Sequence, residues 1–379
     1  MNRSAAWLVL EDGTAFKGWA IGAEGETFGE VVFNTSMTGY QEVLTDPSYK
    51  GQVVCMTYPH IGNYGVNDED VESRRPWVEG FVIRALSPIA SNFRSQEPLD
   101  AYLKRHGVVA VDGVDTRALT LALRERGSMR CGLSTTERDP ARLLERVRGS
   151  PDIIGVDLVK EVTCEAPYDW PLEHHAASPS PMPRAARRAP HHDVVVMDYG
   201  VKYGILRQLA SLGCRVSVLP ASAGVGEILA RKPDGVILSN GPGDPAAVPY
   251  AVEAIRGLLG RVPILGICLG HQLLGLAYGG QTMKLKFGHH GGNHPVQDVA
   301  TGQVAITTQN HNFAVRVDSI PGNDVEVTHR NLNDGTVEGM RHRTLPIVSL
   351  QYHPEAAPGP HDARPHFQAF LKIAEEARR

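Results

Sequence analysis

No apolar run in this sequence approaches the roughly 20 residues that a membrane-spanning helix needs. The apolar stretch near the N-terminus is too short for a signal peptide and leads directly into a strand-like pattern. Neither sign of charge is in large excess, since 38 Lys and Arg residues face 42 Asp and Glu residues among the 379. This balance gives no electrostatic case for binding nucleic acid or an acidic membrane surface.

Cysteine is scarce, with five residues in the chain and no Cys-x-x-Cys pair. An odd and widely spaced set argues against a disulfide framework and against a zinc site, so we expect no metal ion and a reducing, cytoplasmic location. A Gly-x-x-x-x-Gly-Lys-[Ser/Thr] phosphate-binding loop is also missing. The cysteines are Cys55, Cys131, Cys164, Cys214 and Cys268.

The length and composition are typical of a globular protein with more than one domain, since 42% of the residues are hydrophobic and 21% are charged. Residues 171–192 differ from the rest because they are rich in Pro, Ala, Ser and Arg and show no apolar periodicity. Such a segment is typical of a linker. We therefore predict an N-terminal domain over 1–170 and a C-terminal domain over 193–379.

The pattern of apolar residues predicts an α/β protein with different arrangements in the two halves. The first half has short strands and then helices, which indicates a mixed, strand-rich domain. After the linker, short apolar strands alternate with amphipathic helices, which predicts a doubly wound, mostly parallel sheet with ligands beyond the carboxyl ends of its strands. The expected strands are 7–10, 15–21, 29–34, 53–57, 80–85, 193–198, 215–220, 235–239 and 263–267, and the expected helices are 95–105, 115–126, 205–212, 225–231 and 247–259.

The sequence Gly-Ile-Cys-Leu-Gly-His-Gln at 266–272 places Cys268 between a predicted strand and a helix-like run at 272–278. This is the thiol counterpart of the Gly-x-Ser-x-Gly nucleophile elbow, in which the flanking glycines allow a sharp turn. A thiol at the first turn of a helix is favoured as a thiolate by the unpaired N–H groups there. Most cysteines without such a pattern are simply packed as small apolar side chains. The pattern favours a nucleophile.

A nucleophilic thiolate needs a base, and the base needs an orienting partner. His353-Pro-Glu355 follows a predicted strand at 347–352, and side chains two residues apart in an extended chain point the same way. By itself this tripeptide is more often a solvated loop, but the cysteine elbow makes it the expected partner. For an oxyanion hole, the elbow supplies the N–H of Leu269 and the neighbouring Gly-Pro-Gly loop supplies that of Gly243.

Three other patterns have weaker functional interpretations. Gly241, Gly243 and Ala246 match a dinucleotide-binding signature, but Pro242 and Pro245 remove N–H donors that a pyrophosphate would need, so we expect no nucleotide on this chain. The histidines at 289–294 have no thiolate at ligand spacing and flank a Gly pair, which predicts a turn. Residues 310–313, Asn-His-Asn-Phe, follow a predicted strand at 303–307 and also look like a polar turn.

Taken together, the Gly-Ile-Cys-Leu-Gly-His-Gln and His-Pro-Glu sequences resemble the class I (triad) glutamine amidotransferases. The N-terminal half resembles more narrowly the small, glutamine-hydrolysing subunit of carbamoyl-phosphate synthase. Its Phe-Gly-Glu-Val-Val-Phe-Asn-Thr-Ser-Met-Thr-Gly-Tyr-Gln-Glu sequence and Thr-Tyr-Pro-His-Ile-Gly-Asn carry this resemblance. Further matching segments are 89–94, 286–295 and 354–363, so the resemblance covers nearly the whole chain outside the linker.

The resemblance implies that Cys268 is the nucleophile, His353 the acid and base, and Glu355 its orienting partner. Many members have Gly where this chain has Asn312, and a main-chain contact there would be kept if Asn312 adopts the left-handed conformation that Asn tolerates. The glutamine contacts of the family map to Ser48, Gly241, Gly243, Leu269, Gln272, Asn310, Asn312 and Phe313.

The resemblance also implies an activity and a partner. The chain is expected to hydrolyse L-glutamine through a cysteinyl thioester and to pass ammonia through a tunnel to a large synthetase subunit. It needs no cofactor of its own, because ATP, Mg²⁺ and bicarbonate are expected on that large subunit, and the carbamoyl phosphate made would serve arginine or pyrimidine biosynthesis. Two alternatives stay open: an amidotransferase subunit of another synthetase or a free-standing cysteine hydrolase on the same scaffold, and a non-catalytic regulatory subunit.

Overall fold

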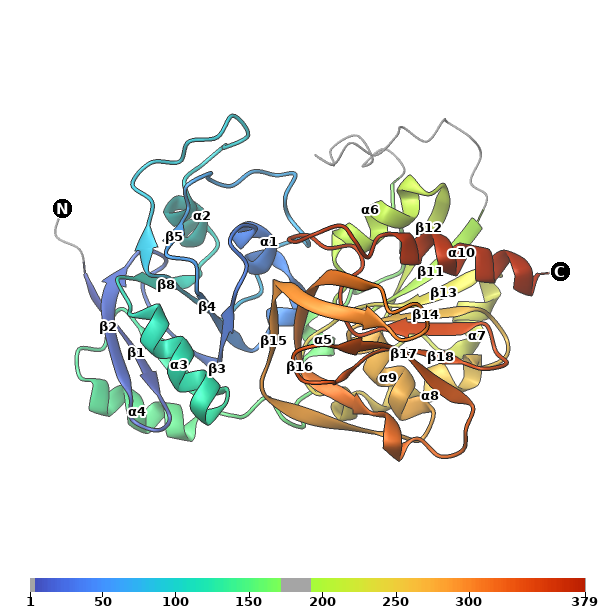
Figure 1. The fold of residues 1–379 in the computed structure, drawn as a ribbon. Coiled ribbons are helices and arrows are strands. Elements are labelled where there is room, and N and C mark those ends of the chain that lie inside the picture. The colour runs from blue at the N-terminus through green and yellow to red at the C-terminus, as the bar shows by residue number, and fades with distance from the viewer. Residues whose placement is uncertain (1–3, 172–191, 379) are drawn as a thin grey trace. The chain divides into compact units, whose positions relative to one another are not determined.

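A computed structural model describes residues 4–171 and 192–378, which form two compact units (Figure 1). The first unit comprises Met1–Val156 together with Lys286–Gly291, and the second comprises Asp157–Leu285 and Gly292–Arg379. The linker predicted at 171–192 lies, apart from its two end residues, outside the described residues, so it stays a prediction. Residues 157–170 belong to the second unit because Trp170 donates its N–H to the Val216 carbonyl and β10 (Tyr168–Asp169) pairs with a strand there.

The first unit is built on a closed β-barrel with the strand order β1-β2-β8-β6-β4-β3-β9. Alternate side chains of its strands enter two hydrophobic clusters; Val31 and Val53 belong to one of them, Val32 and Val54 to the other. The strands are β1 (Ala5–Leu10), β2 (Ala15–Ala20), β3 (Glu26–Asn34), β4 (Gln52–Met56), β6 (Gly80–Val82), β8 (Val109–Asp112) and β9 (Met129–Ser134), and β5 (His60–Ile61) pairs with β7 (Ala85–Leu86). The helices are α1 (Tyr40–Thr45), α2 (Leu99–Arg105), α3 (Thr116–Arg126) and α4 (Pro140–Gly149).

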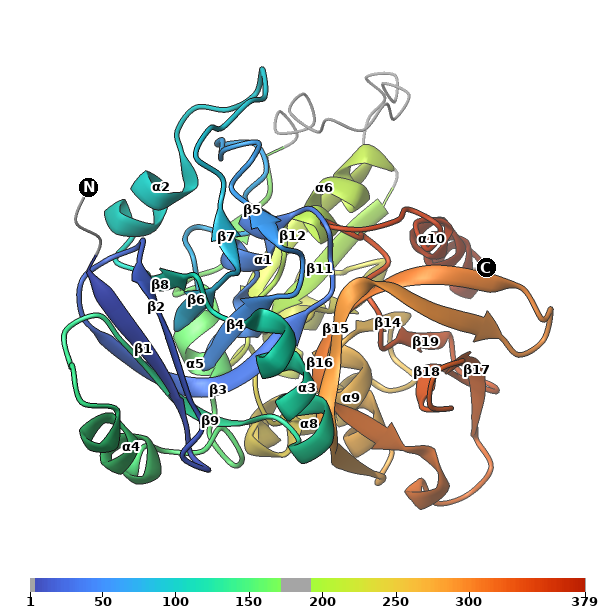
Figure 2. The same ribbon diagram turned by 60° about the vertical axis from the view of Figure 1, so that its left-hand side comes forward.

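The second unit contains a ten-stranded sheet whose central part is parallel, in the order β12-β11-β13-β14-β19. Figure 2 labels four of these strands, β11, β12, β14 and β19. Each of these strands is followed along the chain by a helix, which confirms the doubly wound arrangement. The strands are β11 (His192–Asp198), β12 (Cys214–Pro220), β13 (Gly235–Leu238), β14 (Ile264–Ile267) and β19 (Ile347–Leu350). The helices are α5 (Val159–Val162), α6 (Tyr203–Ser211), α7 (Val225–Ala230), α8 (Pro249–Leu258), α9 (Leu269–Ala277) and α10 (Pro365–Ala377).

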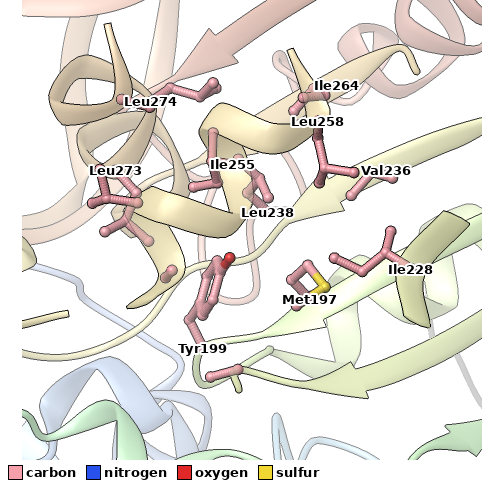
Figure 3. Packing of buried hydrophobic residues seen from close by; sticks show 14 of the residues in the cluster. Met197, Tyr199, Ile228, Val236, Leu238, Ile255, Leu258, Ile264, Leu273 and Leu274 are labelled. Carbon is pink, nitrogen blue, oxygen red and sulfur yellow. The ribbon is translucent and has the colours of Figure 1, made fainter. Parts of the chain in front are cut away.

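Helices cover both faces of this parallel region because alternate strand residues are apolar on each side. On one face, Val236 and Leu238 of β13 pack with Ile255 of α8 and Leu273 of α9, as Figure 3 shows. On the other face, Ile237 packs in a cluster with side chains of α6 and α10. The carboxyl ends of these strands therefore lie between the two layers of helices. The loops that follow β11, β13, β14 and β19 begin there and carry the candidate site.

An antiparallel extension continues the sheet beyond β19 in the order β18-β17-β15-β16. It corrects two expectations, since residues 289–294 lie within β15 (Gln281–Asp298) and residues 310–313 within β16 (Val304–Arg316), so neither segment is a turn. Gly, Asn and His in these segments suggested turns, but pairing with neighbouring strands overrides that local preference. The other two strands are β17 (Val325–Asn331) and β18 (Val337–His342).

Among the described residues, no helix has the length and apolar character required to cross a membrane.

Candidate active site

Cys268 lies at the sharp turn between β14 and α9, where it is the N-cap of the helix. Its backbone has φ 53° and ψ −103°, a conformation that non-glycine residues rarely adopt and that the surrounding structure must enforce. The Cys268 N–H is held by the Leu350 carbonyl at 2.8 Å, and the side chain is 1% exposed. This is the strained geometry of a nucleophile elbow, in which the side chain projects from the end of the strand.

The two glycines of the elbow make this turn possible. A Cβ on Gly270 would lie 2.2 Å from the Leu238 carbonyl oxygen, and a Cβ on Gly266 would lie 2.8 Å from the Gly270 carbonyl. Both contacts are with backbone atoms, which cannot rotate away. Only glycine therefore lets α9 begin directly at Leu269, earlier than the start near Gln272 suggested by the sequence.

His353 and Glu355 follow β19, and their side chains meet as the sequence spacing suggests. His353 Nδ1 and Glu355 Oε1 lie 2.7 Å apart, with the two side chains 1% and 0% exposed. The His353 N–H donates to the Thr308 carbonyl at 2.9 Å, which fixes the backbone of this segment against β16. The carboxylate thus orients the imidazole and leaves its other nitrogen, Nε2, for chemistry.

Lys202 is a fully buried lysine that follows β11, and its role was not predicted from the sequence. Its Nζ donates to Glu355 Oε1 at 2.9 Å and to the Ala356 carbonyl at 2.8 Å, and the residue is 1% exposed. A buried cation beside a buried carboxylate is stable only with such pairing. Lys202 therefore keeps Glu355 ionised and in place. The only local signal was a lysine just beyond the end of a predicted strand.

The charged side chains of this buried cluster shift the pKa values of Glu355 and His353. Burial tends to raise the pKa of Glu355, but the Lys202 ammonium and the His353 imidazolium outweigh burial and lower it. Burial tends to lower the pKa of His353, but Glu355 and Cys268 outweigh it and raise the pKa. His353 is therefore a cation at neutral pH beside the Cys268 sulfur. A protonated imidazole beside the sulfur is an arrangement that activates cysteine nucleophiles.

The residues predicted to contact glutamine lie on elements around Cys268, with one exception. The Asn310 carbonyl oxygen, on β16, lies 3.5 Å from the Cys268 sulfur. Gln272, on α9, donates through Nε2 to the Phe313 carbonyl at 2.7 Å and to Gln351 Oε1 at 3.1 Å. The exception is Ser48, which belongs to the first unit, where its N–H donates to Asp46 Oδ1 at 2.9 Å.

Gly241 and Gly243 lie in the loop after β13. A Cβ on Gly241 would lie 2.2 Å from the Tyr199 carbonyl oxygen, and Gly243 has φ +81°, so both positions require glycine. Asn312 does not have the left-handed conformation expected of it, because it is part of β16 and its φ is not positive. Its main chain is therefore extended, and the expectation from the resemblance is wrong on this point.

Comparison with known proteins decides the family. The model of the carbamoyl-phosphate synthase small chain, CPSase domain, matches residues 8–133, and the model of class-I glutamine amidotransferase matches residues 195–373. The carbamoyl phosphate synthase small chain of Syntrophotalea carbinolica is 54% identical over 373 residues, 98% of this chain and 98% of that one. The chain belongs to the carbamoyl-phosphate synthase small chain family.

Another member and a solved structure are also similar. The carbamoyl phosphate synthase small chain of Aquifex aeolicus is 52% identical over 373 residues, 98% of this chain and 100% of that one. The crystal structure of a glutamine amidotransferase from Thermotoga maritima has 19% sequence identity and a TM-score of 0.37, over 50% of this chain and 86% of that chain. Since the two family members match along nearly their full length, both units belong to the family pattern.

Proposed function

We propose that this chain is the glutamine-hydrolysing subunit of a carbamoyl-phosphate synthase. The observation that carries the proposal is the buried line of side chains from Cys268 through His353 and Glu355 to Lys202. A nucleophile in a strained elbow, a base beside it and an orienting carboxylate are the parts that acyl transfer from an amide requires.

In the first half of the reaction, the Cys268 sulfur attacks the side-chain carbonyl carbon of glutamine, and the oxygen becomes an oxyanion. The N–H groups of Leu269 and Gly243 bind this oxyanion, and contacts from Gly241, Gln272, Asn310 and Phe313 hold the substrate. His353 donates its proton to the amide nitrogen, the C–N bond breaks and ammonia leaves. A thioester between Cys268 and the glutamyl group remains.

In the second half, water adds to the thioester carbon while His353 removes its proton. The C–S bond breaks, glutamate leaves and the sulfur is regenerated beside protonated His353, so the enzyme returns to its starting state. Glu355 stays ionised throughout because Lys202 holds it, and it stabilises the charge that His353 gains. Lys202 is a positioning residue, since it acts on the reaction only through Glu355.

The ammonia is the product that the partner uses. We propose that it passes through a tunnel to a large synthetase subunit, which binds ATP, Mg²⁺ and bicarbonate and makes carbamoyl phosphate for arginine or pyrimidine biosynthesis. A cytoplasmic location fits the thiols of Cys55, Cys131, Cys214 and Cys268, which are all free. The family membership weighs against a subunit of another synthetase, and the intact side chains of the site weigh against a purely regulatory chain.

The proposal is tested by Cys268→Ser in the complex with the large subunit. We expect glutamine-dependent carbamoyl phosphate synthesis to fall by at least about 10³-fold, while synthesis from added ammonia stays near the wild-type rate. Both rates are measured on the same preparation. Loss of both activities would show that Cys268 is structural, and retention of the glutamine-dependent rate would show that it is not the nucleophile.

The chain offers a matched control at Cys214, which is also fully buried in the second unit. Burial raises the pKa of Cys214 to about 12, so this thiol stays protonated and inert. Cys214→Ser makes the same chemical change away from the site, and we expect both synthesis rates to be retained. A loss of glutamine-dependent activity in this variant would attribute the effect of Cys268→Ser to a general disturbance of the core.

A further inference from the structure

Residues 157–164 form a short segment directly after the first unit, and nothing in the sequence assigns them a role. The segment contains Leu158, which is 7% exposed, and the single-turn helix α5 (Val159–Val162), whose Val159 is 0% exposed. Its two ends contact two loops that follow parallel strands. These loops, after β13 and after β11, are the ones that carry Gly243 and Lys202.

The first contact is between Leu158 and Gly243. A Cβ on Gly243 would lie 3.3 Å from Leu158 Cδ1 and 3.5 Å from Leu158 Cβ and Cγ, so the leucine side chain lies directly against the glycine Cα. Gly243 has φ +81° and no side chain to hold it in that conformation. The direction of its N–H, the proposed oxyanion donor, therefore depends on the packing of a neighbour.

The second contact is at the other end of the segment. The Cys164 N–H donates to Asp198 Oδ2 at 2.8 Å, while Asp198 Oδ1 accepts from the N–H groups of Gly200 and Val201 at 2.9 and 2.8 Å. Asp198 is 5% exposed. This buried carboxylate thus ties the segment to the turn that immediately precedes Lys202.

Asn240 links the two loops to each other. Its Oδ1 accepts from the Lys202 N–H at 3.1 Å, and its Nδ2 donates to the Gly200 carbonyl at 2.9 Å. The segment, the oxyanion loop and the Lys202 loop are therefore one connected set of contacts. Electrostatic stabilisation of a transition state needs donors that are held in position before the reaction begins, and contacts of this kind provide it.

We infer that residues 157–164 are a positioning segment of the glutaminase site, in which Leu158 holds the oxyanion loop and the Cys164 backbone holds the loop that carries Lys202. The inference rests on the proposed function and adds residues that do not touch the substrate. Because the oxyanion forms only when the sulfur attacks and is absent from bound glutamine, a disturbance of the segment reduces turnover and leaves glutamine binding nearly unchanged.

The test is Leu158→Ala in the full chain with its large partner subunit. We expect kcat for glutamine hydrolysis to fall about 10- to 100-fold, since a displacement of a catalytic group by about 1 Å can cost about 100-fold, with KM changed less than about twofold. Leu158→Met, which restores the side-chain volume, should recover most of the rate. Leu158→Val is a milder truncation and should change kcat in the same direction, which keeps the test decisive if the alanine variant does not fold.

Leu371→Ala is the matched control. Leu371 is also 7% exposed and lies in the second unit, but on α10. This variant loses a comparable buried side chain and should keep its kcat. If the two alanine variants lower kcat equally, or if Leu158→Ala changes only KM, the inference is overturned.

The aldehyde analogue of glutamine provides a second readout. The Cys268 sulfur adds to its aldehyde carbon, and the resulting oxygen occupies the oxyanion position. We expect Leu158→Ala to weaken inhibition by this analogue by the same factor as kcat, and an unchanged inhibition constant would contradict the inference. Failure of the proposed function is distinguishable, because the wild-type complex would then not hydrolyse glutamine and would not react with the analogue.

Discussion

At the scale of single residues, the sequence predicts groups that are close along the chain and misses those that meet only on folding. His353 and Glu355 are two residues apart, so their pairing follows from extended geometry. Lys202 meets Glu355 across 153 residues, and a single lysine carries no sign in the sequence that it will be buried. Asn312 is a different case: a left-handed conformation was considered because many family members have Gly there, but the residue is part of the strand β16 and its φ is not positive.

A prediction at this scale concerns His271, which is 0% exposed on α9 with Nδ1 2.9 Å from Ser349 Oγ. Burial lowers the pKa of His271 to about 3, so the folded protein keeps this imidazole neutral in mild acid. The unfolded chain takes up a proton there as the pH falls below about 6.5, which stabilises the unfolded state. The contribution to stability is therefore complete above that pH and decreases as the pH falls towards 3.

We expect the wild-type chain to lose about 2 kcal/mol more stability than His271→Gln when the pH falls from about 7.5 to about 5. Urea unfolding of both proteins at the two pH values measures this difference, and the other histidines cancel in the comparison. Equal losses in the two proteins would mean that His271 is protonated in the folded state and that its burial does not control its charge.

At the scale of secondary structure, short apolar runs that alternate along the chain with amphipathic segments predicted the parallel strands and the helices between them. Of the antiparallel extension, only the strand expected at 303–307, the start of β16, was predicted, because the extension's strands are rich in polar residues that bond to one another. His311 Nε2 lies 2.7 Å from Gln309 Oε1, and Gln309 Nε2 donates to Glu338 Oε2 at 3.0 Å, all within a buried group. Polar residues at buried strand positions look like turn residues until their partners are known.

The start of α9 gives a prediction at this scale. Gly270→Ala would place a Cβ 2.2 Å from the Leu238 carbonyl oxygen and so force α9 away from β13. We expect the free energy of unfolding to fall by about 1–3 kcal/mol, the usual cost of overpacking, and glutamine hydrolysis to fall with it because Cys268 is the N-cap of the same helix. Chemical denaturation and a glutaminase assay on the same preparation measure both effects.

Gly226 is the control, because it lies in α7 of the same unit and a Cβ there meets no atom within 4 Å. Gly226→Ala should leave activity unchanged and stabilise the protein by up to about 1 kcal/mol, since alanine favours helix more than glycine does. The interpretation of the elbow is wrong if both substitutions have the same effect on stability and activity.

At the scale of the whole chain, length alone indicates more than one domain, but it does not show how the chain is divided between them. The structure assigns residues 286–291, in the middle of β15, to the first unit, while the rest of that strand belongs to the second. A continuous strand carries no change in composition where it passes from one unit to the other, so sequence composition cannot mark this division.

Each unit has hydrophobic clusters of its own, and this leads to a prediction about unfolding. Leu8 belongs to a cluster of the barrel and Leu209 to a cluster of the parallel sheet, and both are 0% exposed. Since either substitution by alanine removes about 2–5 kcal/mol from one core only, we expect calorimetry of the isolated chain to resolve two transitions. Leu8→Ala should lower the temperature of one of them and Leu209→Ala that of the other. A single two-state transition, shifted alike by both variants, would show instead that the two cores unfold together.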